Sequence, residues 1–342
     1  MKIAVFLGGC SMERNVSLAS GCAVKKALEN NGHTVKLIDP ALGSDQTPLQ
    51  PILENFSAST PITLKDLSLL PSKNIINTIN SKHLDDVDVV FLALHGEWGE
   101  DGKIQSLLEM RGIPYTGSGV MSSALTMDKG MTKILMQHFG IKTPNWFILN
   151  SKNYDESNSA NKIKNEIGFP AVIKPNDQGS TVGLTIVKNV DEVSSALKLA
   201  SQFGKSILIE EFIPGRELTV TIINNEAYPI IEIKPQDGFY DYKHKYTKGM
   251  TEYLCPAPIS EELTKQVQAE SLKLFQISDC KGFARVDFRL KDDSSFYCLE
   301  INTLPGMTET SLVPKSAAAK GIKFSDLCQN IVDSAITEFK NK

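Results

Sequence analysis

A lysine stands at the start of a loop rich in glycine and hydroxyl side chains. Lys174 ends the apolar run 171–174, which predicts a strand, and residues 175–183 read PNDQGSTVG. Backbone N–H groups in such loops suit phosphate oxygens, and a nearby ammonium offsets the phosphate charge. The spacing is not that of a Walker A motif. These residues alone allow two interpretations, a phosphate-binding loop or a polar hairpin with a solvated lysine.

Charged and amide side chains alternate along two strand candidates further on. Arg285 and Asp287 lie two residues apart in one apolar run, and Glu300 and Asn302 lie two residues apart in the next. Because strand side chains alternate between faces, each pair points to one face. If the strands are neighbours, Asp287, Glu300 and Asn302 converge as oxygen ligands of the kind that Mg²⁺ takes beside phosphates. Two edge strands with Arg–Asp salt bridges on their outer faces are the alternative.

Two other loops carry groups suited to small polar ligands. The segment 303–314, TLPGMTETSLVP, offers hydroxyl groups and the backbone N–H of Gly306, where the lack of a side chain allows close approach to a ligand. An ordinary turn is an equal interpretation. His95 ends a strand candidate and Glu13 lies in the loop after Gly9, so both could face one crevice at the carboxyl ends of parallel strands. A purely structural histidine is the alternative there.

The elements that must position these residues follow from apolar runs and their periodicity. The chain opens with the apolar run 3–7, followed by two glycines and a segment at 17–30 whose apolar residues have helical spacing. This order is typical of an α/β layer with a buried parallel sheet. Later strand candidates indicate an antiparallel sheet with helices on one side. Residues 41–86 give no assignable elements. We expect helices at 17–30 and 131–139, a polar connection at 151–161, and strands at 3–7, 34–38, 87–94, 171–174, 206–211, 217–223, 227–233, 282–290 and 295–301.

Composition excludes several classes of protein. The chain has 342 residues, 41% hydrophobic and 22% charged, as in a globular protein of two or three domains. A net charge of −4 gives no basic field for nucleic acid or an anionic membrane. The six cysteines lack C-x-x-C spacing, which favours reduced thiols. No apolar run reaches the roughly 20 residues that cross a bilayer, and the run 3–7 is too short for a signal peptide. We therefore expect a cytoplasmic protein.

Seven segments together resemble one known family. In order, and over nearly the whole chain, they are similar to the D-alanine:D-alanine ligases of the ATP-grasp superfamily. Residues 41–86 are the poorly matched part. The segments are GGCSMERNVSLASG (8–21), ALHGEWGEDG (93–102), YTGSGVMSSALTMDK (115–129), FPAVIKPNDQGSTVG (169–183), FYDYKHKY (239–246), GFARVDF (282–288) and LEINTLPGMTETSLVP (299–314).

The resemblance implies an α/β fold, in part α+β, with three domains. These are an N-terminal Rossmann-like parallel-sheet domain at 1–117 that binds substrate, a central ATP-grasp domain at 118–211, and a C-terminal ATP-grasp domain at 212–342. The C-terminal domain would carry the magnesium ligands and a covering loop at about 235–254, with Gly238 and Gly249 as flexible points. A homodimer is also implied.

The resemblance further implies ATP-dependent joining of two D-alanine molecules to D-alanyl-D-alanine, for peptidoglycan precursor synthesis. ATP and two Mg²⁺ ions, which Mn²⁺ can replace, would be the cofactors. The carboxylate of the first D-alanine attacks the γ-phosphate and gives an acylphosphate, from which the amine of the second D-alanine displaces phosphate. Catalysis of this transfer is mostly positioning and charge stabilisation.

Individual residues of the ATP site follow from the matched motifs. The resemblance assigns the phosphates to Lys129, Lys174 and Lys245, the adenine to the strand at Glu210, and the ribose to Glu217. The metal ligands would be Asp287, Glu300 and Asn302. The whole nucleotide set is Lys129, Lys174, Ser180, Glu210, Glu211, Ile213, Glu217 and Lys245.

The amino-acid site is implied in the same way. Glu13 would fix the ammonium of the first D-alanine, with His95 near its carboxylate, and Ser180 and Tyr246 would hydrogen-bond with Glu13. Arg285 and the Gly306 amide would stabilise the oxyanion of the tetrahedral intermediate, and Ser311 with Leu312 would receive the second carboxylate. The expected catalytic residues are Glu13, Ser180, Tyr246, Arg285, Gly306 and Ser311, and the expected substrate-binding residues are Glu13, His95, Arg285, Ser311 and Leu312.

Three positions bear on the choice among related activities. Tyr246 favours a dipeptide product, because relatives that make D-alanyl-D-lactate generally lack this tyrosine. Gln178 replaces the Glu of many members and leaves the closure of the covering loop open, and Thr181 stands for the commoner Ser. The alternative hypotheses are another ATP-grasp ligase, such as one that accepts D-lactate, and a nucleotide-binding protein without catalysis.

Overall fold

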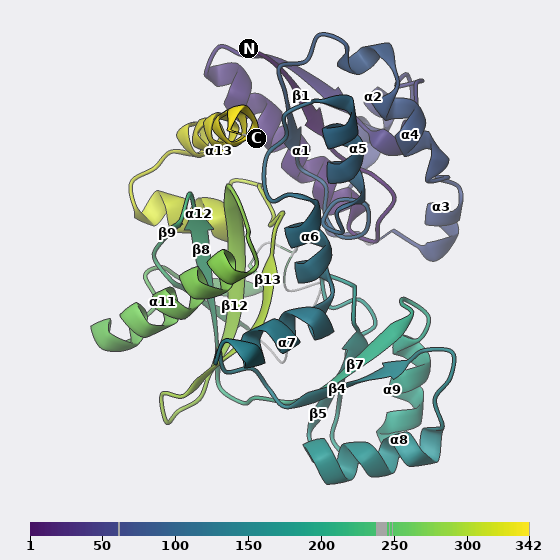
Figure 1. The fold of residues 1–342 in the computed structure, drawn as a ribbon, viewed down its shortest axis with the longest axis vertical. Helices are drawn as coiled ribbons and strands as arrows, with labels where there is room; N and C mark the ends of the chain where they lie inside the picture. Colours follow the sequence, from purple (N-terminus) through teal and green to yellow (C-terminus); the bar gives the residue numbers. More distant parts are fainter. Residues whose placement is uncertain (61, 237–244, 246, 248, 342) are drawn as a thin grey trace.

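Three β-sheets form the framework of the chain (Figure 1). The computed structural model describes residues 1–60, 62–236, 245, 247 and 249–341. A parallel sheet of three strands opens the chain, an antiparallel sheet of four strands follows, and an antiparallel sheet of six strands completes it. This is the mixed α/β fold that the sequence predicts.

The first sheet has the strand order β2-β1-β3, and all its pairings are parallel. Its central strand is apolar from Ile3 to Phe6 and fully buried, which explains why the sequence shows no alternation there. The strand at 34–38 matches the prediction, and the helix starts three residues earlier than predicted. The elements are β1 (Lys2–Phe6), α1 (Arg14–Asn30), β2 (Thr34–Ile38), β3 (Val89–Leu92) and α5 (Lys103–Arg111).

Short helices occupy the span that gave no assignable elements. Each has five to seven residues, too few to show a 3.6-residue period in the sequence. Thr63 and Asp66 form a reciprocal capping box at one of them. The elements are α2 (Leu49–Asn55), α3 (Leu64–Ser68) and α4 (Lys73–Ile79), with 3₁₀ turns η1 (Pro40–Leu42) and η2 (Lys82–Leu84).

The second sheet has the order β4-β7-β5-β6. The polar connection predicted at 151–161 is wrong, because a helix begins at Glu156. Asp155 caps it by accepting the Asn158 N–H at 2.7 Å, and Ser159 faces inward. The elements are α6 (Val120–Met127), α7 (Lys129–His138), β4 (Trp146–Asn150), α8 (Glu156–Lys162), the π-helical turn η3 (Ile163–Ile167), β5 (Ala171–Pro175), β6 (Thr185–Val187), the 3₁₀ turn η4 (Val190–Glu192), α9 (Val193–Ala200) and β7 (Ser206–Glu211).

The third sheet has the order β11-β10-β8-β12-β13, with β9 beside β8. The single strand predicted at 227–233 is wrong, because it is broken near Pro229, which lacks the N–H that a ladder needs. The last residues of the predicted covering loop, 251–254, form a strand that pairs with β10. The elements are β8 (Arg216–Ile223), β9 (Glu226–Ala227), β10 (Ile231–Pro235), β11 (Thr251–Leu254), α11 (Glu261–Ile277), β12 (Phe283–Leu290), β13 (Phe296–Asn302), α12 (Leu312–Ala319) and α13 (Phe324–Lys340).

Two helices pack on a sheet that is distant in sequence. Buried residues of α13, including Leu327 and Ile331, share one apolar cluster with β1 and β3, and Figure 1 shows this yellow helix beside the purple start of the chain. Met136 of α7 lies in the apolar cluster of the third sheet. The boundaries predicted at 117/118 and 211/212 stay predictions.

No helix among the described residues is long and apolar enough to cross a membrane. All six cysteines, which lie in the described part of the chain, are free thiols.

Candidate active site

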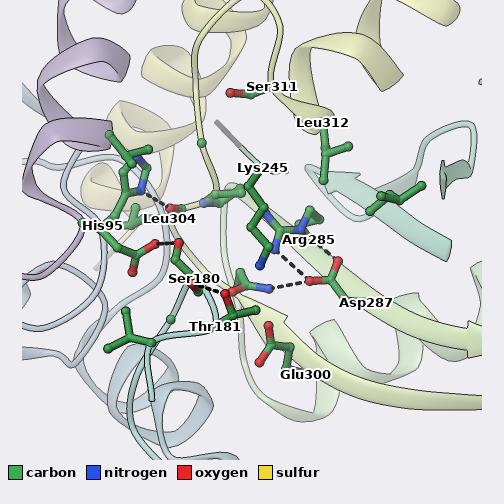
Figure 2. A pocket seen from close by; sticks show the side chains of 18 of the residues that line it. His95, Ser180, Thr181, Lys245, Arg285, Asp287, Glu300, Leu304, Ser311 and Leu312 are labelled. Carbon is green, nitrogen blue, oxygen red and sulfur yellow. Dashed lines mark hydrogen bonds and ion pairs between the residues drawn. The ribbon is translucent and has the colours of Figure 1, made fainter. Parts of the chain in front are cut away.

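The acidic side chains converge as the strand alternation predicts. β12 pairs antiparallel with β13, which sets Arg285 opposite Asn302 and Asp287 opposite Glu300. Arg285 donates to both carboxylate oxygens of Asp287, at 2.9 and 2.8 Å, and the Asn302 Nδ2 donates to Asp287 at 3.1 Å (Figure 2). Thr219 of β8 donates to the same carboxylate at 2.6 Å. These bonds hold Asp287 on the cavity face of the sheet.

A buried ion cluster lies beneath the lysine of the phosphate-type loop. The Lys174 Nζ lies 2.5 Å from Glu210 Oε1, and the Lys133 Nζ lies 2.8 Å from Glu210 Oε2. Lys133 also donates to the Thr143 hydroxyl at 2.6 Å. Burial favours the neutral acid, but the two lysines outweigh it and lower the pKa of Glu210 to about 2. Burial lowers the pKa of Lys133, whereas Lys174 is also buried but Glu210 and Glu300 raise its pKa, so the Lys174 ammonium stays charged next to the loop.

Glu300 is held ionised by a second set of lysines. The Lys129 Nζ lies 3.4 Å from Glu300 Oε2 and donates to the Gln178 carbonyl at 2.7 Å. Although burial opposes ionisation, Lys129, Lys174 and Lys245 lower the pKa of Glu300 to about 2. Lys129 begins helix α7, and Lys245 lies in the connection between β10 and β11. Four separate segments thus contribute charge to one place.

The loop after Lys174 reaches the N-terminal part of the chain. The Ser180 hydroxyl donates to the Glu13 carboxylate (Figure 2). A Cβ at Gly179 would collide with that carboxylate, so only glycine permits this approach. Ser180 and Thr181 both have left-handed backbone, at φ +47° and +60°, a strained conformation that is frequent at functional loops. The structure thus brings together Ser180 and Glu13, two residues predicted for the amino-acid site.

His95 is buried at the Glu13 end of the site, and both its ring nitrogens are engaged. Nδ1 lies 2.7 Å from the Leu304 carbonyl, which only accepts, so this nitrogen carries the proton. Nε2 then accepts from the Ser20 hydroxyl at 3.0 Å. Burial lowers the pKa of His95, against the opposing effect of Glu13. His95 lines the cavity, and its place near the carboxylate of the first D-alanine stays a prediction.

Glu100 is a second acidic group at this end, next to Glu13. Its oxygens accept from the Gly96 N–H at 2.8 Å and the Leu304 N–H at 3.0 Å. Burial and the negative charge of Glu13 raise the pKa of Glu100 to about 7, despite these two bonds. Glu100 is not among the predicted site residues, and its only signal in the sequence is its place in the segment ALHGEWGEDG (93–102).

Ser311 lies at the start of helix α12, facing the same space. Its hydroxyl lies 2.7 Å from the Thr308 hydroxyl and accepts the Thr308 N–H at 3.1 Å. A Cβ at Gly306 would come within 3.0 Å of the Ser311 hydroxyl. Figure 2 shows Ser311 and Leu312 on the opposite side of the site from Glu300. A helix N-terminus and a hydroxyl side by side favour an anionic group.

One cavity of about 560 Å³ joins most of these groups. The predicted residues that line it are Glu13, His95, Lys129, Lys174, Ser180, Glu217, Lys245, Arg285, Asp287, Glu300, Asn302, Gly306, Ser311 and Leu312. Burial raises the pKa of Glu217 to about 7, although Lys245 and Arg289 oppose this. Tyr246 and Gly238 lie outside the described residues.

Three predicted nucleotide residues do not line the cavity. Glu210 is buried behind Lys174, and Glu211 accepts a long hydrogen bond of 3.4 Å from Asn145. The Ile213 carbonyl accepts from Arg289 at 3.1 Å. Glu210 and Glu211 belong to β7, and Ile213 lies in the turn after it. Lys133 was overlooked in the sequence, where its only signal is a lysine four residues after Lys129 on one helix.

The donor set at the sheet fits magnesium. Two carboxylates and one amide, from Asp287, Glu300 and Asn302, are hard oxygen donors, and the adjacent lysines favour a phosphate beside them. Within the described residues, no group of three or more His, Cys, Asp or Glu side chains gathers in a metal-binding arrangement. The predicted magnesium ligands include only two side chains of these types, Asp287 and Glu300, and the third predicted ligand is the amide of Asn302.

The three sheets and the lysine-flanked, carboxylate-lined cavity between them define a protein of the ATP-grasp class. Comparison with known proteins specifies the family. Residues 2–118 match the family model "D-ala D-ala ligase N-terminus" and residues 135–333 match "D-ala D-ala ligase C-terminus". The chain belongs to the D-alanine–D-alanine ligase family.

Curated relatives and solved structures agree over the full length. A D-alanine–D-alanine ligase from Syntrophotalea carbinolica is 41% identical, covering 98% of this chain and 96% of the relative. One from Aquifex aeolicus is 40% identical over 97% of this chain and all of the relative (100%). The crystal structure of the Bacillus anthracis ligase complexed with ATP has a TM-score of 0.76 at 32% identity, and covers 100% of this chain and 99% of that chain.

Proposed function

We propose that this protein is an ATP-dependent ligase that joins two D-alanine molecules for peptidoglycan precursor synthesis. Family membership supports the reaction, and one structural observation supports its location. Lys174, Glu300 and Glu13 line a single cavity although they belong to the second sheet, the third sheet and the N-terminal part of the chain. The cavity therefore offers adjoining places for a nucleotide phosphate and a small amino acid.

ATP occupies the end that is rich in lysine. Lys129, Lys174 and Lys245 bind the phosphates, and the ionised Glu210 keeps Lys174 charged and oriented toward them. The adenine lies against the end of β7, at Glu210 and Glu211, and the turn that carries Ile213. Asp287, Glu300 and Asn302 would hold two Mg²⁺ ions, which would supply positive charge beside the phosphates.

The first D-alanine lies beside Glu13, which accepts hydrogen bonds from its ammonium group. Ser180 fixes the Glu13 carboxylate, so the substrate carboxylate is aimed at the γ-phosphate. The acylphosphate that forms is attacked by the amine of the second D-alanine, whose carboxylate lies at Ser311 and the start of α12. Arg285 and the Gly306 N–H stabilise the oxyanion of the tetrahedral intermediate.

Tyr246, the closure of the loop between β10 and β11, the homodimer, the cytoplasmic location and the domain boundaries stay predictions. Pro235 and Gln236 precede this connection and Gly249 lies near its other end. The loop would exclude water from the acylphosphate.

Product analysis tests the proposal. With Mg²⁺ and ATP, D-alanine is expected to yield D-alanyl-D-alanine and phosphate in equal amounts, and L-alanine is expected to yield neither. Competition between D-alanine and D-lactate, followed across pH, distinguishes the dipeptide ligase from a ligase that accepts D-lactate. The amine of D-alanine stops acting as a nucleophile when it is protonated, whereas the hydroxyl of D-lactate does not change with pH in this range. Binding of ATP without D-alanine-dependent release of ADP would contradict the assignment and support a non-catalytic protein.

A further inference from the structure

The loop that carries Gly306 is fastened at both ends to the N-terminal part of the chain. Glu100 accepts the Leu304 N–H at 3.0 Å, and His95 donates to the Leu304 carbonyl at 2.7 Å, so both polar groups of Leu304 are bound from one side. On the other side of Gly306, the Met307 N–H donates to the Ser20 hydroxyl at 3.2 Å. Ser20 is also the partner of His95.

Packing reinforces these bonds. The side chains of Leu304 and Met307 are 2% and 1% exposed and lie in the apolar cluster of the first sheet. The two residues between them, Pro305 and Gly306, line the cavity. The backbone amide of Gly306 is therefore placed by the N-terminal part of the chain, not by the third sheet that precedes it in sequence.

We propose that Glu100 is a positioning residue, which with His95 and Ser20 holds the 304–307 loop so that the Gly306 N–H meets the oxyanion of the second chemical step. Glu100 also accepts the Gly96 N–H at 2.8 Å and thereby ties the His95 loop to the same carboxylate. Its two oxygens are both used as acceptors, which explains why a carboxylate is suited to this position. An amide has only one accepting oxygen and would set an N–H against a donor.

The inference rests on the proposed function. The role of Glu100 and the proposed function can be tested separately, because the reaction has two chemical steps. Phosphoryl transfer needs the lysines and the Glu13 side of the cavity, whereas the oxyanion forms only when the second amine attacks. Glu100→Gln is therefore expected to slow dipeptide formation by about tenfold or more, the scale for a lost hydrogen bond to a charged group, with the KM for ATP unchanged. Glu261→Gln, at a glutamate of α11 whose side chain is 83% exposed, is the matched control and should leave both unchanged.

Isotope scrambling in ATP separates the steps. Movement of ¹⁸O between the β,γ-bridge and the non-bridge positions requires reversible phosphoryl transfer to D-alanine. In Glu100→Gln we expect scrambling to continue while dipeptide formation falls. A wild-type rate of dipeptide formation, or an equal fall in scrambling and in dipeptide, would overturn the positioning role. A wild-type protein that forms no dipeptide would instead contradict the proposed function.

Ser20→Ala removes the acceptor at the other end of the loop. We expect it to lower kcat in the same selective way, and the double variant to be less impaired than the product of the two single effects, because both act through one loop. If Glu100→Gln does not fold, Ser20→Ala decides: a selective fall in kcat supports the positioning of the loop, and an unchanged kcat rejects it.

Discussion

The buried carboxylates in and around the cavity differ in their pKa values according to how many lysines face them. Several lysines lower the pKa values of Glu210 and Glu300 to about 2, whereas at the N-terminal end the pKa of Glu100 is raised to about 7. The pKa of Glu217, a buried acid that faces the single lysine Lys245, is also raised to about 7. Burial acts at both ends. The difference is that lysines surround the first two acids, while Glu100 has backbone N–H groups and a second acid, Glu13, as neighbours.

This contrast separates two ways of building a site. The lysine-rich end consists of ionised side chains of both signs. It suits a polyanion with its bound cations, and its binding depends on the balance of charge. The other end is held by hydrogen bonds to backbone groups and is suited to a small molecule without net charge, so it depends on geometry. Removing charge at the lysine-rich end should therefore damage ATP binding most, and changing Glu13 or its hydrogen bonds should damage amino-acid use most.

The largest effect is expected from Lys174→Gln. This change leaves the buried Glu210 with one lysine and removes a phosphate ligand. We expect kcat/KM for ATP to fall by about 100-fold or more, as for the loss of one member of a buried charged pair, with less change in the KM for D-alanine. Steady-state kinetics measures both. Lys198→Gln, at the exposed surface of α9, is the control. If only the kcat/KM for D-alanine fell, the assignment of Lys174 to the ATP end of the cavity would be wrong.

A smaller effect, on the other substrate, is expected from Glu13→Gln. The amide keeps the size of the side chain but loses the charge that pairs with an ammonium group. We expect the KM for D-alanine to rise by about 10- to 100-fold, while ATP binding measured by calorimetry stays within a factor of about two. Loss of ATP binding in this variant would show that the two ends are not independent.

Ser180→Ala tests the contact between the loop and Glu13. Because the hydroxyl donates to an ionised carboxylate, its loss is expected to lower kcat/KM for D-alanine by about tenfold. In the double variant with Glu13→Gln the second change should add little, since one hydrogen bond serves both residues. Strictly additive effects would mean that Ser180 acts on the phosphates alone.

The smallest expected effect is on acid stability. The folded pKa of Glu210, about 2, lies below its ordinary value of 4.5, so unfolding at acidic pH takes up a proton. Its stabilisation is complete above pH 4.5 and is lost as the pH falls toward 2, which amounts to about 1 kcal/mol by pH 4. Urea unfolding at pH 6 and pH 4 should show a smaller pH dependence in Glu210→Gln, and an unaltered dependence in Glu261→Gln at the surface of α11. Equal slopes in all three proteins would contradict the charge-balance account.

Sequence reasoning succeeded where a local period decides the outcome. The alternation at Asp287 and Glu300 predicted their shared face, and the register of β12 and β13 confirms it. The strand at 206–211 was also predicted to the residue. The helix at 156–162 was missed because its polar sequence buries few side chains, and the cap at Asp155 was the one signal available.

Partners that meet only in three dimensions were beyond such reasoning. Lys133 looked like an ordinary helical lysine, and only the approach of β7 to α7 makes it a buried partner of Glu210. Glu100 lies in one short motif with Glu97 and Asp101, and no sequence pattern indicates which of the three acids belongs to the site. The structure distinguishes Glu100 because its carboxylate reaches Leu304, about two hundred residues further along the chain.

The packing of α13 on the first sheet has a consequence for biosynthesis. Strands β1 and β3 precede the other two sheets in the sequence, whereas Leu327 and Ile331 of the apolar cluster that covers them follow both sheets. The apolar surface of the first sheet therefore stays uncovered until both other sheets have been translated, and it needs shielding during that time.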